Sequence, residues 1–65
     1  MEREYELFER RADGSLNWRG VVSGLEDARV RVYLLADETD HECFAMYPPD
    51  KEIVIRVRPI VPSEQ

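Results

Sequence analysis

The sequence predicts an α+β domain with a two-layer β-β-α-β-β architecture, in which a four-stranded, mostly antiparallel sheet carries one helix on one face. A helical period of apolar residues runs through 23–36, whereas the segments on either side alternate apolar and polar residues as strands do. Asp13-Gly14 and 48–51 have turn composition and separate the strands of each flanking pair. A length of 65 residues predicts one domain spanning 1–65.

Alternation places the strands at about 4–11, 16–22, 42–47 and 52–58, with a tail over 59–65. Tyr5 and Leu7 of the first strand are expected to face the helix. The second strand is expected to present to the helix Leu16, Trp18, Gly20 and Val22. Gly20 is expected to allow the helix to pass close overhead, since a glycine within a strand often marks close approach of another backbone or a bulge.

The fourth strand has the clearest alternation, and it predicts an inner face of Ile53, Ile55 and Val57 and an outer face of Val54, Arg56 and Arg58. For the third strand two alternatives stay open, because either Phe44 and Met46 or Cys43 and Ala45 could face away from the helix. The pattern does not predict the order of the strands in the sheet.

The helix is expected over about 24–38, with an apolar stripe formed by Leu25, Ala28, Val32, Leu35 and Ala36. Ser23 and Glu26 have the spacing of a capping box, which would mark its start. Residues 29–32 also alternate like a strand, but the cap, the length and the helix-forming residues favour a helix. Asp40 or His41 is expected to adopt the left-handed conformation that ends it.

Composition excludes several classes of protein. A single cysteine rules out an internal disulfide, and no cysteine–histidine set has the spacing of a zinc module. The longest apolar run, 32–36, is far too short for a membrane span, and the acidic start of the chain is unlike a signal peptide. The net charge of −5 disfavours nonspecific binding to nucleic acids or anionic membranes. We therefore expect a cytoplasmic protein without membrane attachment.

Three short motifs carry a resemblance to other proteins. They are W-R-G-V-V-x-G-L-E-x-A at 18–28, E-C-F-A-M-Y at 42–47 and I-V-I-R-V at 53–57. In this order they resemble a group of short bacterial hypothetical proteins, which have a similar Trp-x-Gly strand, Gly-Leu-Glu helix start and closing hairpin. The resemblance covers about 5–57 and implies no activity.

The residues that could carry chemistry are few. His41 and Cys43 are the candidates for nucleophilic catalysis, but the four acids between 37 and 42 would oppose a thiolate, and Cys43 is expected to be buried. The same acidic turn lacks the spacing and the glycine of a calcium-binding loop. The sequence therefore predicts a protein that is not an enzyme and has no cofactor, metal or small-molecule substrate.

The expected function is protein interaction. One helix cannot cover both faces of a four-stranded sheet, so Phe8, Val21 and Val54 are expected to form an apolar surface on the open side. A second apolar group, on the far side of the helix, is formed by Val30, Tyr33 and Leu34. The most economical partner is a second copy, giving a homodimer, and another protein is the other candidate. The alternative function is binding of single-stranded nucleic acid by Phe8, Arg19, Arg56 and Arg58, which the acidic charge of the chain makes the weaker hypothesis.

Overall fold

The computed structural model describes residues 2–58 and confirms the predicted fold class. The elements are β1 (Glu4–Arg10), β2 (Leu16–Ser23), α1 (Leu25–Thr39), β3 (Glu42–Tyr47) and β4 (Glu52–Val57). Every predicted element is present, and no boundary differs by more than one residue from the prediction. The predicted tail over 59–65 lies outside the described residues.

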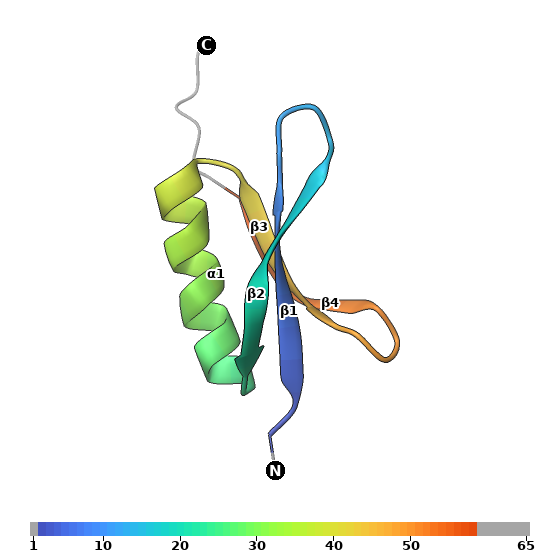
Figure 1. Ribbon diagram of the computed structural model, residues 1–65. Helices are drawn as coiled ribbons and strands as arrows, with labels where there is room; N and C mark the ends of the chain where they lie inside the picture. Colours follow the sequence, from blue (N-terminus) through green and yellow to red (C-terminus); the bar gives the residue numbers. More distant parts are fainter. Residues whose placement is uncertain (1, 59–65) are drawn as a thin grey trace.

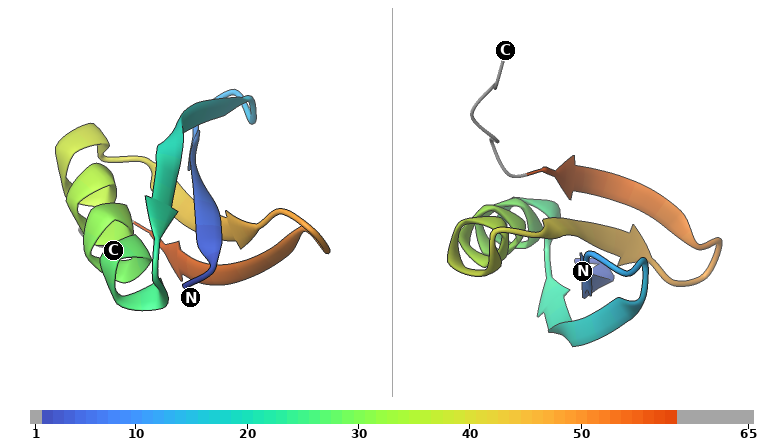
Figure 2. Two further views of the ribbon diagram at one scale, coloured as in Figure 1. Left: turned by 60° about the horizontal axis from the view of Figure 1, so that its bottom comes forward. Right: turned by 90° about the horizontal axis from the view of Figure 1, so that it is seen from above.

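The sheet has the strand order β2-β1-β3-β4, and every neighbouring pair is antiparallel. The β1–β2 hairpin therefore forms one half of the sheet and the β3–β4 hairpin the other half. The two hairpins meet where β1 pairs with β3. Figure 1 shows α1 lying along one side of the twisted sheet, and Figure 2 shows that the opposite side carries no second layer of the described chain.

The core lies between α1 and the two central strands. Its buried residues are Tyr5, Leu7, Ala28, Val32, Leu35, Ala36, Cys43 and Ala45. The sheet contributes alternate positions of β1 and β3, and the helix contributes four members of its predicted stripe. This resolves the alternative for the third strand, because Cys43 and Ala45 face the helix and Phe44 and Met46 face away.

The two ends of α1 differ in how well they were predicted. The predicted capping box is wrong, because Ser23 still belongs to β2 and the N-cap residue is Gly24. Gly24 makes no side-chain capping bond, and its amide donates to the carbonyl of Arg3 at 2.8 Å. Leu25 is predicted as part of the buried stripe but is 53% exposed, so its place in the stripe is wrong. At the other end Asp40 has φ 60° and its amide donates to the Ala36 carbonyl, as expected. With 15 residues, α1 is shorter than a helix that spans a membrane, and the described residues contain no helix that could do so.

Because of a bulge in β2, half of the residues predicted to face the helix face away from it. Leu7 pairs with Gly20 but Phe8 pairs with Trp18, so Arg19 is the extra residue between them. An extra residue reverses the alternation beyond it. Gly20 and Val22 remain on the helix side, whereas Leu16 and Trp18 are on the opposite side, 50% and 58% exposed.

Gly20 itself is explained by this bulge and not by the helix. Its φ of +126° is a conformation that other residues adopt only with strain, and a Cβ placed on it would have no neighbouring atom within 4 Å. Close approach of the helix is therefore the wrong interpretation, and the bulge is the right one.

A second bulge has the same effect on β4. Ala45 pairs with Ile55 but Met46 pairs with Ile53, so Val54 is the extra residue. Val54 packs partly buried against the core, and Ile53 is 37% exposed, which reverses the predicted orientation of both. Both bulges lie in edge strands, where only one neighbouring ladder is disturbed and where an irregular edge resists pairing with another sheet.

Candidate interaction surface

Three rows of paired residues cross the sheet on the side away from α1. The first row is Leu16–Arg10–Glu42, the second is Trp18–Phe8–Phe44–Arg56 and the third is Val21–Glu6–Met46–Ile53. Directly paired residues share one face of a sheet, so these side chains all lie on the same side. We call the surface formed by the three rows the open face.

Large apolar side chains are exposed on the two edge strands of the open face, three on β2 and one on β4. Trp18 is 58% exposed, Leu16 50%, Val21 49% and Ile53 37%. Between them the rings of Phe8 and Phe44 are stacked, with centroids 5.4 Å apart and an interplanar angle of 23°. Isolated exposed apolar residues are ordinary, but a contiguous group on one face usually marks a contact surface.

One end of the open face is basic. Glu42 lies within ion-pair distance of Arg10 at 3.5 Å, Arg56 at 3.1 Å and Arg58 at 4.0 Å. The guanidinium of Arg10 also lies 5.8 Å from the centroid of the Phe44 ring. Three arginines share one carboxylate, so this cluster keeps a net charge of +2.

The other end of the open face is acidic. Glu4 and Glu6 are on the same face of β1 as Phe8 and Arg10, because the alternate residues Tyr5, Leu7 and Glu9 are buried under the helix. Neither Glu4 nor Glu6 forms an ion pair with any residue between 2 and 58. Charge of one sign therefore lies at each end of an apolar centre.

Only some of the predicted interface residues lie on the open face. Phe8 and Val21 lie on the open face as expected, but the second bulge removes Val54 from it. Sequence reasoning missed Leu16, Trp18 and Ile53, which are exposed on this face. The signal that could have found Leu16 and Trp18 was Gly20, because a strand glycine is typical of a bulge.

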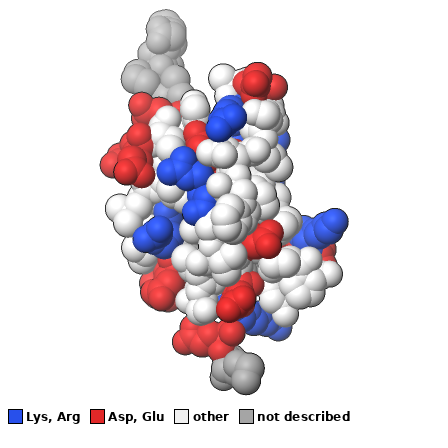
Figure 3. Space-filling model, viewed as in Figure 1, with Lys and Arg blue, Asp and Glu red and all other residues white. Residues whose placement is uncertain are grey.

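The predicted nucleic-acid face does not assemble as expected. Arg19 is on the helix side, where its Nη1 donates to Glu9 Oε1 at 3.0 Å. Arg56 and Arg58 reach the open face, but both lie within ion-pair distance of Glu42. On the side of the molecule shown in Figure 3, basic groups lie among acidic ones.

The second predicted apolar group, on the far side of α1, is exposed as expected. Val30 is 49% exposed, and Tyr33 and Leu34 are each 58% exposed. A surface hollow of about 410 Å³ lies beside them, lined by Arg31, Leu34, Leu35, Asp37 and Glu38. All of its lining residues belong to α1, so no second element between residues 2 and 58 closes it.

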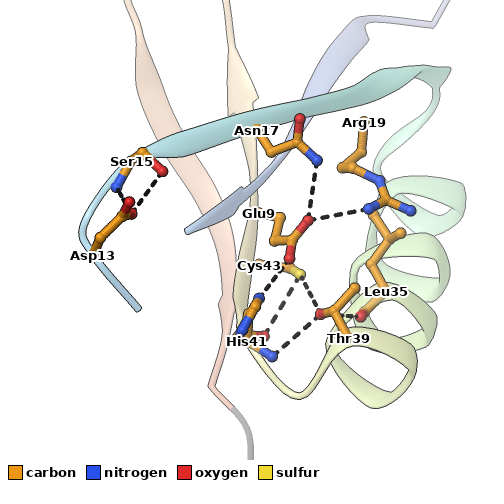
Figure 4. Close-up of polar contacts among 9 residues, drawn as sticks. All are labelled: Glu9, Asp13, Ser15, Asn17, Arg19, Leu35, Thr39, His41 and Cys43. Atoms are coloured by element: carbon orange, nitrogen blue, oxygen red, sulfur yellow. Dashed lines mark hydrogen bonds and ion pairs between the residues drawn. The ribbon is translucent and has the colours of Figure 1, made fainter. Parts of the chain in front are cut away.

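Under the helix, Glu9 is 5% exposed and its carboxylate accepts three hydrogen bonds (Figure 4). His41 Nδ1 donates at 2.5 Å, Asn17 Nδ2 at 3.2 Å and Arg19 Nη1 at 3.0 Å. The hydrogen bond from His41, together with those from Asn17 and Arg19, lowers the pKa of Glu9 from 4.5 to about 2. The cluster joins β1, β2 and the turn after α1, so its role is to fix these segments together.

Glu9 should make the stability of the fold depend on acid. Its pKa is lower in the folded than in the unfolded chain, so its contribution is complete above about pH 4.5 and is lost as the pH falls towards 2. We expect the unfolding free energy of Glu9→Gln, followed by circular dichroism in urea, to fall less steeply over this range than that of the unchanged chain. Glu26→Gln, on an exposed ion pair, is the control and should keep the original slope. Equal slopes for Glu9→Gln and the unchanged chain would contradict the assignment.

Cys43 is buried, as predicted, and lies beside this cluster. Its Sγ is 3.8 Å from Thr39 Oγ1, and burial raises the pKa of the thiol. A buried thiol with a raised pKa is a poor nucleophile. Among residues 2–58 no group of histidine, cysteine and acidic side chains has the geometry to hold a metal ion.

Comparison of the chain with models of known families, with curated proteins and with solved structures found no match. The resemblance to short bacterial hypothetical proteins therefore stays a prediction.

Proposed function

We propose that this chain is a small, non-enzymatic, cytoplasmic interaction protein that forms a homodimer through its open face. The observation that carries the proposal is the position of Trp18, which is 58% exposed at the end of a row with Phe8 and Phe44. An aromatic side chain in this setting would gain free energy from burial against a partner, and tryptophan is enriched among residues that dominate binding energy.

The bulges favour a contact through the face over one through an edge. Arg19 in β2 and Val54 in β4 interrupt the regular ladder on both outer strands. A helix about 10 Å across lies on one side of the sheet, so the other side offers the larger regular surface. A second copy is a suitable partner because a small domain gains stability from covering this surface, and twofold dimers are the commonest assembly.

Sedimentation from micromolar to millimolar concentration tests the proposal. We expect a concentration-dependent dimer, accompanied by a change in the fluorescence of Trp18, which is the single tryptophan of the chain. Val21→Glu should weaken this dimer by about tenfold or more, since it puts a charge among the exposed apolar side chains of the open face.

Val30→Glu is the matched control, because Val30 is also 49% exposed but lies on α1. It should leave association unchanged. Loss of the dimer in Val30→Glu with none in Val21→Glu would assign the interface to the helix. A monomer at about 1 mM would overturn the proposal, since that limit corresponds to about 4 kcal/mol of association.

Binding of single-stranded nucleic acid is the second candidate, and the exposure of Trp18 next to Phe8 is the observation in its favour. Against it, Phe44 is only 3% exposed and the nearby arginines share Glu42. An oligonucleotide titrated at about 50 mM salt should leave the fluorescence of Trp18 unchanged if the first proposal holds. Binding that weakens steeply with added salt would favour the second.

A further inference from the structure

The charge pattern of the open face determines how two copies can stack. When two identical faces meet, the twofold axis lies in the plane between them, either along the strands or across them. An axis along the strands would place the basic cluster of Arg10, Arg56 and Arg58 against itself. An axis across the strands instead turns Arg10 towards the acidic end, against Glu6 of the second copy, which lowers the electrostatic energy; Arg56, on the middle row, faces Arg56 of the second copy.

The register of β1 positions this axis. Phe8 is midway between Glu6 and Arg10, which are four residues and about 13 Å apart along the same face. An axis that crosses β1 at Phe8 therefore exchanges the positions of Glu6 and Arg10. The same rotation brings the first row of one copy over the third row of the other.

We infer that the dimer is an antiparallel stack of two open faces, in which Arg10 of each copy pairs with Glu6 of the other; this rests on the proposed self-association. The strands of the two sheets run in opposite directions, to within the angle of about 30° that sheet twist imposes. The axis follows the row Trp18–Phe8–Phe44–Arg56, so β2 lies over β2 and Leu16 faces Val21 of the second copy.

The ionic partners needed for this arrangement are present. Glu6 lies between Val21 and Met46 and has no ion pair among residues 2–58, so it can accept one from the second copy. Arg10 lies 3.5 Å from a carboxylate that two other arginines share, so Glu42 stays neutralised when Arg10 turns to the second copy. Two such pairs per dimer offset part of the repulsion between chains that each carry a charge of −5.

Charge reversal separates the two axes. In the antiparallel stack, Glu6→Arg alone and Arg10→Glu alone each bring like charges together and should weaken the dimer by about tenfold or more. The double variant Glu6→Arg/Arg10→Glu should recover the original affinity to within about threefold, and an equimolar mixture of the two single variants should form heterodimers. Glu38→Arg, an exposed change on α1 with the same effect on net charge, is the control for Glu6→Arg and should keep the dimer.

A crosslink gives a second readout that does not depend on charge. Oxidation of a mixture of Leu16→Cys and Val21→Cys chains should join one of each, while Cys43 is buried and does not compete. Efficient crosslinking of Leu16→Cys to itself would overturn the antiparallel stack but not the proposed function. The same holds if the single charge reversals have no effect on a dimer that Val21→Glu disrupts. A monomeric unchanged chain would overturn the proposed function with it.

Discussion

Replacing Leu7 by alanine is expected to remove a large part of the stability of the fold. Leu7 is 1% exposed and lies at the centre of the core between β1, α1 and β3. Truncation of a buried leucine costs about 2–5 kcal/mol, because transfer energy is lost and a cavity remains. A domain of this size has about 3–10 kcal/mol in total, so this loss is a large share of the free energy of unfolding and should lower the urea midpoint clearly.

Urea unfolding followed by circular dichroism measures this effect. The chain should be kept dilute enough that the midpoint no longer changes with concentration, so that dimer formation does not add to the result. Leu34→Ala is the matched control, because Leu34 is 58% exposed on α1, and it should change the free energy of unfolding by about 0.5 kcal/mol or less. Similar losses in both variants would show that Leu7 is not at the centre of the core.

Replacing Trp18 by alanine is expected to leave the stability of the monomer nearly unchanged but to weaken the dimer. More than half of this side chain is already in solvent, so the dilute monomer should lose about 1 kcal/mol or less. In the proposed dimer Trp18 lies on the twofold row and is covered by the second copy. Loss of a large aromatic side chain that the partner covers costs about 2 kcal/mol or more, which weakens association by about thirtyfold.

Sedimentation compares Trp18→Ala with Tyr33→Ala, an aromatic residue that is also 58% exposed but lies on α1. The tyrosine variant should dimerise like the unchanged chain. A Trp18→Ala chain that unfolds when dilute would indicate that Trp18 packs against the helix, and one that dimerises normally would place the interface elsewhere.

The elements and the central part of the core follow from local sequence. The hydrophobic period over 25–39 and the alternation in each strand depend on neighbouring residues, and they place Leu7, Val32 and Leu35 in the core correctly. The left-handed Asp40 is likewise local, since the acidic turn after the helix contains no glycine. For such features, side-chain spacing and backbone preference act within a few residues of each other.

Glu9 shows a limit of the same reasoning. Alternation puts it on the same face as Tyr5 and Leu7, but a buried carboxylate needs hydrogen-bond donors. Its donors come from Asn17 and Arg19 on β2 and from His41, which is 32 residues away in the chain. Only the folded chain brings these groups together.

The two faces of the edge strands were decided by the tertiary structure. The sequence alone determines an uninterrupted alternation through Leu16, Trp18, Gly20 and Val22, and through Ile53, Ile55 and Val57, which predicts three exposed residues as buried. The bulges at Arg19 and Val54 reverse both strands partway along, because each edge strand must match the register of a central strand that is itself fixed by packing on α1. Pairing between strands is nonlocal, and one added residue moves every later side chain to the other face of the sheet.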